Sequence, residues 1–142
     1  VDPKKRMVFN PEESIDFHGF TGPFVQYTYA RIQSVLKKAE YIGETEKNLT
    51  VGELLPPEKE QIRLLEQFPA TVRQACTEMS PAVIANYVYA VAKTFNSFYA
   101  GHSIKNAENE AKRQLRLEIS YLTGVVIRNG MQLLGIAVPE RM

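Results

Sequence analysis

The spacing of apolar residues after a Ser-Pro pair limits the fold of this chain more than any other feature. Between Pro81 and Tyr99 these residues recur three or four positions apart, which places them on one face of an α-helix. Ser80 is a favourable capping residue, Pro81 is tolerated in a first helical turn, and Gly101 is placed to end the helix. We therefore expect a helix whose buried face consists of Ile84, Val88, Val91, Phe95 and Phe98.

Similar patterns, interrupted by prolines and glycines, divide the rest of the chain into helices. No segment shows the sustained alternation of a β-strand. The predicted fold class is therefore all-α, a helical bundle of about five helices with an irregular N-terminal lead-in, and 142 residues suffice for one domain with a real core. The other expected helices are a single turn after Asn10, a long helix capped by Thr21, helices over 57–68 and 70–78, and a last long helix that Asn106 opens and that ends or bends at Asn129-Gly130.

The long helix after Thr21 separates into distinct faces at about 100° per residue. Gln26 and Ala30 fall on the side that we expect to face solvent. Thr28 falls within the core face, where its hydroxyl can bond to a carbonyl one turn earlier. The predicted core face consists of Val25, Tyr29, Ile32, Val35, Leu36 and Ala39.

Two further helices show apolar residues at helical spacing. In the helix over 57–68, we expect Ile62, Leu65 and Phe68 to face the core. The last long helix carries a stripe that we also predict to be buried. Its members are Ala111, Leu115, Ile119, Leu122 and Val126.

Composition excludes several classes of function. The net charge of +1 gives no bulk electrostatic argument for nucleic-acid binding, so such a function must rest on a local arrangement. The single cysteine excludes an internal disulfide, and His18 and His102 stand alone, without another metal ligand at a suitable spacing. The sequence contains no phosphate-binding glycine loop. We therefore expect no metal, no cofactor and no catalytic residue in this chain.

The chain also lacks the signals that direct proteins to membranes or for export. No apolar run approaches the roughly 18 residues of a membrane span, and the start does not resemble a signal peptide. We therefore expect a cytoplasmic protein without a membrane partner. The sequence begins at Val1 without an initiator methionine, which favours a fragment of a longer chain.

Two helix edges combine aromatic rings with polar groups. Phe24, Tyr27, Arg31 and Lys38 share one edge beside the core face. Tyr89 and Asn96 share a flank of the later helix. Rings stack on unpaired bases and amide groups read base edges, so both edges are candidate contacts to single-stranded RNA. Two other interpretations remain open. Such rings often pack against a neighbouring helix, and they could form a helical protein-interaction module that receives a partner helix.

The order of residues in three separate segments resembles that of a known family. FNPEESIDFHGFTGPFVQYTYARI, SPAVIANYVYAVAKTFNSFY and RNGMQLLGIAVPERM resemble the C-terminal part of arginyl-tRNA synthetases, which are class I ligases. TGPFVQYTYAR is similar to the family's segment TGPYxQYxHxR, although Tyr29 stands where histidine is common and Phe24 where tyrosine is frequent. Both departures keep a ring, but a hydroxyl contact from position 24 is lost.

This resemblance implies the domain organisation and the partners. Residues 1–20 would be a lead-in from the end of the catalytic body, and residues 21–142 the helical anticodon-binding domain. The parent enzyme would use ATP and Mg to join arginine to its tRNA, whereas this part of it would hold no cofactor and be inactive alone. Its partners would be the anticodon loop of arginine tRNA and the catalytic domain of the same chain.

The resemblance also implies which residues bind the loop. Phe24, Tyr27 and Arg31 would contact it, and Met142 would close a pocket around the middle cytosine of the anticodon. Tyr89 and Asn96 are candidate contacts from the helical geometry instead.

Overall fold

The computed structural model describes residues 6, 8, 10–16, 19–41, 43, 50–104 and 106–142. Within these residues it contains six helices and no strand, which confirms the all-α prediction. Five of the helices are long, and the sixth is a single turn in the N-terminal lead-in. They are α1 (Pro11–Ser14), α2 (Gly22–Lys38), α3 (Pro56–Glu66), α4 (Phe68–Glu78), α5 (Pro81–Gly101) and α6 (Glu110–Leu133).

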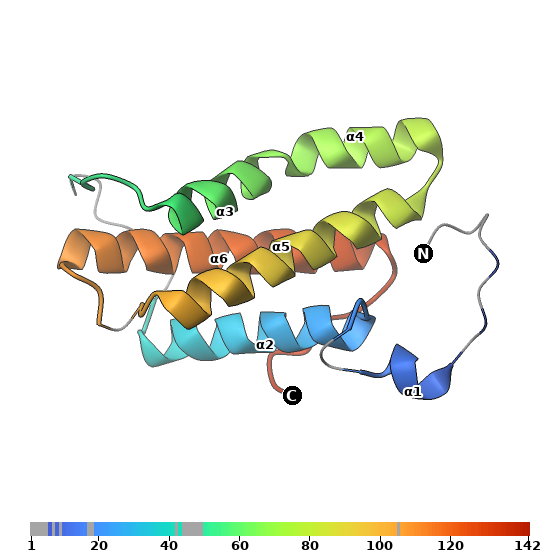
Figure 1. The fold of residues 1–142 in the computed structure, drawn as a ribbon, viewed down its shortest axis with the longest axis horizontal. Coiled ribbons are helices and arrows are strands. Elements are labelled where there is room, and N and C mark those ends of the chain that lie inside the picture. Colours follow the sequence, from blue (N-terminus) through green and yellow to red (C-terminus); the bar gives the residue numbers. More distant parts are fainter. Residues whose placement is uncertain are drawn as a thin grey trace.

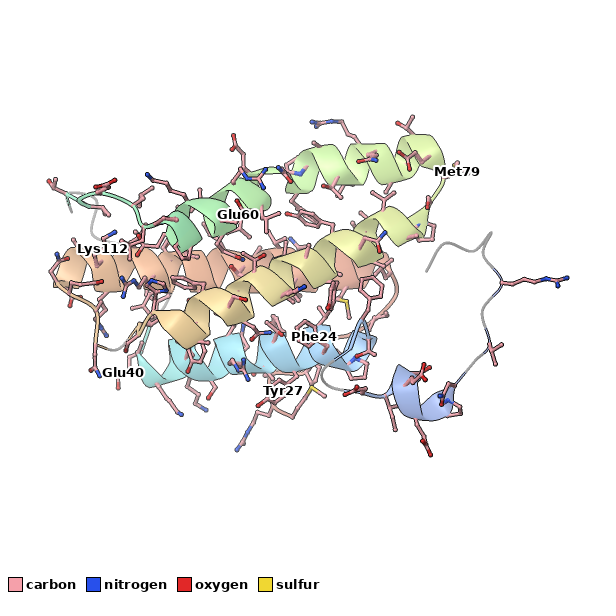
Figure 2. The ribbon with its side chains drawn as sticks, in the orientation of Figure 1. Phe24, Tyr27, Glu40, Glu60, Met79 and Lys112 are labelled. Atoms are coloured by element: carbon pink, nitrogen blue, oxygen red, sulfur yellow. The ribbon has the colours of Figure 1, made fainter. Side chains whose placement is uncertain are left out.

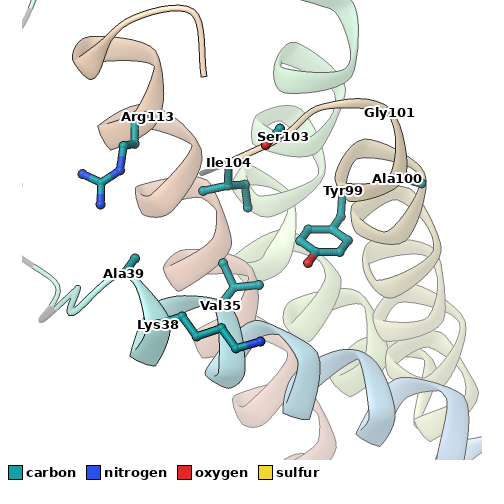
Figure 3. A pocket seen from close by; sticks show the side chains of 9 residues that line it. All are labelled: Val35, Lys38, Ala39, Tyr99, Ala100, Gly101, Ser103, Ile104 and Arg113. Atoms are coloured by element: carbon teal, nitrogen blue, oxygen red, sulfur yellow. The ribbon is translucent and has the colours of Figure 1, made fainter. Parts of the chain in front are cut away.

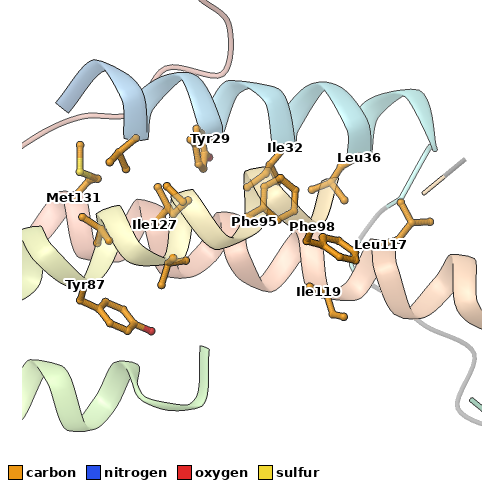
Figure 4. Packing of buried hydrophobic residues seen from close by; sticks show 14 of the residues in the cluster. Tyr29, Ile32, Leu36, Tyr87, Phe95, Phe98, Leu117, Ile119, Ile127 and Met131 are labelled. Carbon is orange, nitrogen blue, oxygen red and sulfur yellow. The ribbon is translucent and has the colours of Figure 1, made fainter. Parts of the chain in front are cut away.

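The long helices form three layers (Figure 1). Helices α5 and α6 run side by side in the middle, α2 lies against both of them on one side, and α3 and α4 cover the other side. The core lies where α2, α5 and α6 meet. There Tyr29, Ile32 and Leu36 of α2 face the rings of Phe95 and Phe98 of α5 (Figure 4).

The starts of α2 and α5 follow the sequence signals. The Thr21 hydroxyl accepts a hydrogen bond of 3.2 Å from the Phe24 N–H, which caps α2. One turn later, the Thr28 hydroxyl donates to the Phe24 carbonyl over 2.9 Å, as expected. Helix α5 begins after Ser80, and its predicted core face is confirmed because Ile84, Val88, Val91, Phe95 and Phe98 are all buried.

The prediction for α6 is wrong in its start and only partly right in its buried face. Asn109 rather than Asn106 caps the helix, by accepting the Lys112 N–H over 2.8 Å. Of the predicted stripe Ile119 is buried, Leu115 and Val126 are partly buried against the core, and Leu122 is exposed. The buried face also includes the apolar residues Leu117, Ile127 and Met131. Its other buried residues are small, polar or charged, namely Lys112, Arg116, Ser120, Thr123, Gly124 and Gly130.

A buried ionic network explains why charged residues lie on this face. Glu58 of α3 is fully buried and accepts hydrogen bonds from Lys112 over 2.7 Å and from Arg116 over 3.0 Å. Burial alone would raise the pKa of Glu58, but hydrogen bonds from Lys112, the Leu55 N–H and Arg116 outweigh it and hold that pKa below its ordinary value. Because opposite charges compensate one another, α3 and α6 can bury them where apolar residues were expected.

The same network changes the buried face of α3. Glu58 and Gln61 are the buried residues of this helix, whereas Ile62, predicted to face the core, is exposed. Leu65 and Phe68 are partly buried against the core, as predicted. The Gln61 amide donates to the Thr123 hydroxyl of α6 over 3.0 Å, which adds another polar contact between α3 and α6.

Gly130 allows α6 to pass close to α5. A Cβ atom at this position would lie 2.4 Å from Cγ1 of Val88, a distance that real Cβ contacts do not show. The helix does not end or bend at Asn129-Gly130 but continues to Leu133. The reversal comes at Gly135, whose φ of 73° lies in the left-handed region that favours glycine.

After Gly135 the C-terminal tail returns along α2. The Gln26 amide donates to the Ala137 carbonyl over 2.7 Å. Ala30, expected to face solvent, is only 7% exposed and lies in the wall of a hollow that the tail residues Glu140 and Met142 also line. The expectation for Ala30 was wrong because a segment distant in sequence lies against this side of α2.

Candidate nucleic-acid interface

The guanidinium group of Arg31 lies between two half-exposed rings. Its central carbon is 4.9 Å from the ring centroid of Tyr27, one turn earlier on α2, and 5.7 Å from that of Tyr99 on α5. Both distances fall within the range of cation–π attraction. The rings remain accessible, with Tyr27 41% and Tyr99 37% exposed. A planar cation is therefore displayed at the surface with aromatic surface next to it.

A chain of hydrogen bonds ties this guanidinium group to the bundle. Arg31 Nη1 donates to Oδ1 of Asn96 on α5. Asn96 Nδ2 in turn donates to the hydroxyl of Thr28 over 2.8 Å, and that hydroxyl donates to the Phe24 carbonyl. These hydrogen bonds run from α2 to α5 and back to α2. They therefore fix Arg31 with respect to both helices.

Tyr27, Arg31, Tyr99 and Met142 line one hollow, which we call the tail cavity. Its volume is about 330 Å³, and Figure 2 shows Tyr27 on the side of α2 along which the tail runs. Met142 is 57% exposed, so its side chain is available to a ligand. The complete lining is Tyr27, Ala30, Arg31, Ser34, Val35, Lys38, Tyr99, Glu140, Arg141 and Met142.

The charges around the tail cavity are unequal. Among the side chains that line it, Arg31, Lys38 and Arg141 contribute three cations, against the carboxylate of Glu140. Among the described carboxylates, none forms an ion pair with Arg31 or Lys38. A local excess of positive charge thus exists although the whole chain carries a net charge of only +1.

Figure 3 shows a second hollow, of about 940 Å³, which we call the helix-end cavity. Both cavities have Val35, Lys38 and Tyr99 in their walls. Arg113 of α6 lines the helix-end cavity and is paired with exposed Glu110 over 2.9 Å. Tyr99 and Lys38 therefore stand between two hollows that together extend along the C-terminal ends of α2 and α5.

Phe24 and Tyr89 lie apart from these cavities. Their ring centroids are 5.3 Å apart, and Tyr89 also meets Phe20 of the lead-in at 4.5 Å. Phe24 is partly buried and packs against the core. Phe20 and Tyr89 line a separate apolar hollow of about 200 Å³. The predicted residues thus form two groups, with Tyr27, Arg31, Asn96 and Met142 together and the Phe24–Tyr89 pair elsewhere.

Sequence reasoning missed Tyr99 and the residues of the tail apart from Met142. Tyr99 follows Asn96 by three residues, so the same helical spacing that selected Asn96 could have found it. Glu140 and Arg141 reach the cavity only because the chain reverses at Gly135. No local pattern predicts which helix such a tail will contact.

Other kinds of site receive no support from the described part of the chain. There, no group of three or more His, Cys, Asp and Glu side chains could hold a metal ion. His102 stacks on Phe98 with the ring centroids 5.9 Å apart, and His18 lies outside the described residues. None of the described helices is both long enough and apolar enough to cross a bilayer.

Exposed rings beside a cation are typical of domains that bind unpaired nucleotides. Residues 25–142 match the sequence profile of the DALR anticodon binding domain. Since this match spans most of the chain, the chain belongs to that family.

Arginine–tRNA ligases of two bacteria are similar in sequence to this chain. An arginine–tRNA ligase of Flavobacterium psychrophilum is 49% identical over 143 positions, covering 100% of this chain and 23% of that protein. The arginine–tRNA ligase of Bacteroides thetaiotaomicron is 50% identical over 149 positions, covering 100% and 24%. The chain thus spans about a quarter of the length of these relatives.

Solved structures agree. The arginyl-tRNA synthetase of Thermus thermophilus superposes with a TM-score of 0.88 at 32% identity, covering 99% of this chain and 24% of that one. The arginyl-tRNA synthetase of Plasmodium falciparum, at 24% identity, shares the fold with a TM-score of 0.81 over 94% of this chain. The resemblance to arginyl-tRNA synthetases is confirmed, and these findings do not favour the alternative of a protein-interaction module.

Proposed function

We propose that this chain binds the anticodon loop of arginine tRNA, as the anticodon-binding domain of an arginine–tRNA ligase. The observation that carries the proposal is the position of Arg31 between the exposed rings of Tyr27 and Tyr99, at a cavity that Met142 lines. The family and the relatives support the same function.

The tail cavity has the chemistry to hold one unpaired base. A volume of about 330 Å³ is at the lower end of what small-molecule sites offer. In our proposal a base stacks on Tyr27, which contributes roughly 1–3 kcal/mol, while Met142 covers another part of the ring. Arg31 carries N–H donors and no acceptor, so it selects a base edge that presents acceptors. The middle cytosine of the anticodon, with its carbonyl and ring nitrogen, presents such an edge.

A wrong base would be rejected by unpaired polar groups. A donor edge facing Arg31 leaves N–H groups without partners in a partly dry site, which costs about 1–3 kcal/mol. Specificity would therefore come from the mismatch as much as from the correct contact.

The loop backbone would follow the helix-end cavity. Lys38 faces both cavities, and Arg113 lies in the wall of the larger one. Cations beside a stacked base neutralise the adjoining phosphates, and they make binding weaken as salt rises.

The packing of Phe24 and Tyr89 favours a structural role for these two residues. Their contact with Phe20 attaches the lead-in to the bundle at the start of α2. We infer that residues 1–20 lead in from the catalytic domain of the parent ligase, and that residues 21–142 form the anticodon-binding domain. The parent would use ATP and Mg and act in the cytoplasm, whereas this chain alone would join no arginine to tRNA.

Titration of a labelled anticodon stem-loop of arginine tRNA tests this function. We expect binding that weakens with salt and that falls at least about tenfold when the middle cytosine is replaced by uracil, since one lost polar contact costs about that much. A stem-loop with a change confined to its paired stem is the matched control. Binding that is indifferent both to salt and to the middle base would overturn the proposal.

A further inference from the structure

We propose that Asn96 is a positioning residue, which holds the guanidinium plane of Arg31 for the base without neutralising its charge. This inference rests on the proposed function and deepens it, because it assigns the orientation of the recognising cation to the pair Thr28 and Asn96. Neither side chain then needs to touch the RNA.

The direction of each hydrogen bond from Arg31 through Asn96 and Thr28 to Phe24 is determined. The Thr28 hydroxyl has one proton, which it donates to the Phe24 carbonyl over 2.9 Å, so toward Asn96 it can only accept. The amide nitrogen of Asn96 must therefore face Thr28, and its oxygen must face Arg31. A flipped amide would place its N–H groups against the guanidinium group of Arg31. The contacts with Thr28 and with Arg31 therefore both require the same orientation of the Asn96 amide.

This arrangement prepares Arg31 for binding. Arginine side chains lose much rotational freedom when they are held, and a group held in advance does not lose it again on binding. Asn96 occupies a donor of Arg31 on one side, while Tyr27 and Tyr99 flank the guanidinium plane. The donors not bonded to Asn96 are left for a ligand in the tail cavity.

The choice of an amide is informative. A carboxylate at position 96 would orient Arg31 equally well but would neutralise it. Asn96 supplies the same acceptor without charge, and none of the described carboxylates forms an ion pair with Arg31. The positive charge of Arg31 is therefore kept for the RNA, whose binding depends on such charges.

A double-mutant cycle separates positioning from direct contact. We expect Asn96→Ala to weaken stem-loop binding about threefold to tenfold, because Arg31 loses the hydrogen bond that orients it before binding. In an Arg31→Ala background, the same substitution should have no further effect, because it acts only through Arg31. Asn86→Ala, at an exposed position of α5, is the matched control and should bind as the parent chain does. Additive losses would mean that Asn96 contacts the RNA itself, which overturns the inference.

Thr28 provides a second test because it is 0% exposed and cannot reach RNA. Thr28→Val keeps the shape but removes the hydroxyl, so binding should weaken about as much as in Asn96→Ala, while Thr28→Ser restores it. Asn96→Asp should also weaken binding and should lower the slope of log affinity against log salt by about one, because it neutralises one cation. Unchanged binding in Thr28→Val, or an unchanged salt slope in Asn96→Asp, contradicts the inference.

A measurement on the free protein tests the positioning role of Asn96 separately from the proposed binding of RNA. In the free protein, NMR should show slow rotation of the Arg31 guanidinium group, and Asn96→Ala should make it fast. If the Arg31 signals do not change in that variant, the positioning role is wrong. If Arg31→Ala binds the stem-loop as tightly as the parent chain, the proposed site itself is wrong.

Discussion

At the scale of single residues, the Tyr27 ring contacts Arg31 and also leaves exposed surface on which a base could stack. The ring centroid lies 4.9 Å from the Arg31 guanidinium carbon, and 41% of the residue remains exposed. An exposed cation–π pair of this kind contributes only about 0.5–1 kcal/mol to folding. Stacking on a base contributes roughly 1–3 kcal/mol to binding. The ring should therefore matter more for binding than for folding.

Tyr27→Ala measures this difference. We expect stem-loop affinity to fall about fivefold to 150-fold, which corresponds to the stacking energy, while the melting temperature changes by only a few degrees. Tyr27→Phe keeps the ring and should retain most of the affinity. A large loss of thermal stability with unchanged affinity would show that the ring serves the core instead.

The same scale shows how far residue spacing could predict the site. Tyr27 and Arg31 are one turn apart on α2, so local geometry was enough to bring them together. Asn96 was also selected by spacing, but its partners Thr28 and Arg31 lie on another helix. Helical spacing orders the residues of one helix, whereas the contact between two helices depends on their packing.

At the scale of helices, the crossing of α5 and α6 depends on a missing side chain. The Cβ atom that alanine would add at position 130 meets Cγ1 of Val88 at 2.4 Å, and Val88 is buried and branched at Cβ, so it cannot turn aside. The close approach of the two helices is thus a property of Gly130.

Gly130→Ala should therefore destabilise the domain. Overpacking of this kind typically costs about 1–3 kcal/mol, which denaturant unfolding can measure. Gly101→Ala is the matched control, since a Cβ atom there meets nothing within 4 Å, and it should change the free energy of unfolding little. If both substitutions have the same effect, the crossing does not require a glycine.

The pairing of α3 with α6 should make stability depend on acidic pH. The pKa of Glu58 is held below its ordinary value of 4.5, so the unfolded chain binds a proton before the folded one does. The stabilisation is complete above about pH 4.5 and is lost as the pH falls through the lower, folded pKa.

Glu58→Gln tests this contribution. It leaves Lys112 and Arg116 buried without their shared carboxylate, so at neutral pH we expect a loss of about 3–5 kcal/mol in the free energy of unfolding. Below pH 4.5 the difference from the parent chain should narrow. Glu60→Gln, which breaks only the exposed pair with Arg63, is the control and should change little. A constant difference at every pH would show that the charge of Glu58 is not responsible.

Helix α6 also shows why a hydrophobic stripe can mislead. Leu115, Leu122 and Val126 have the spacing of a core face, yet the bundle buries Lys112 and Arg116 beside them. The sequence contains the partner, Glu58, but nothing local indicates that a carboxylate more than fifty residues away will be buried with these two cations. Burial of paired charges is decided by tertiary contact, which periodicity does not describe.

At the scale of the whole molecule, the all-α class and most helix limits could be predicted because proline, glycine and capping residues mark them locally. The C-terminal tail could not be placed in this way. Met142 was expected at the pocket only by resemblance to a family, and physically its position depends on the reversal at Gly135 and on the bond from Gln26 to Ala137. The site is therefore assembled from α2, α5 and the last residues of the chain.

The most direct test of the central claim observes the methyl groups of methionine by NMR while the anticodon stem-loop is added. Met142 lines the tail cavity, whereas Met79, 88% exposed where α4 meets α5, is a natural reference (Figure 2). We expect the Met142 signal to shift in proportion to bound stem-loop, less so when the middle cytosine is replaced, while the Met79 signal stays in place. A shifted Met79 signal with an unmoved Met142 signal would contradict base recognition at this cavity.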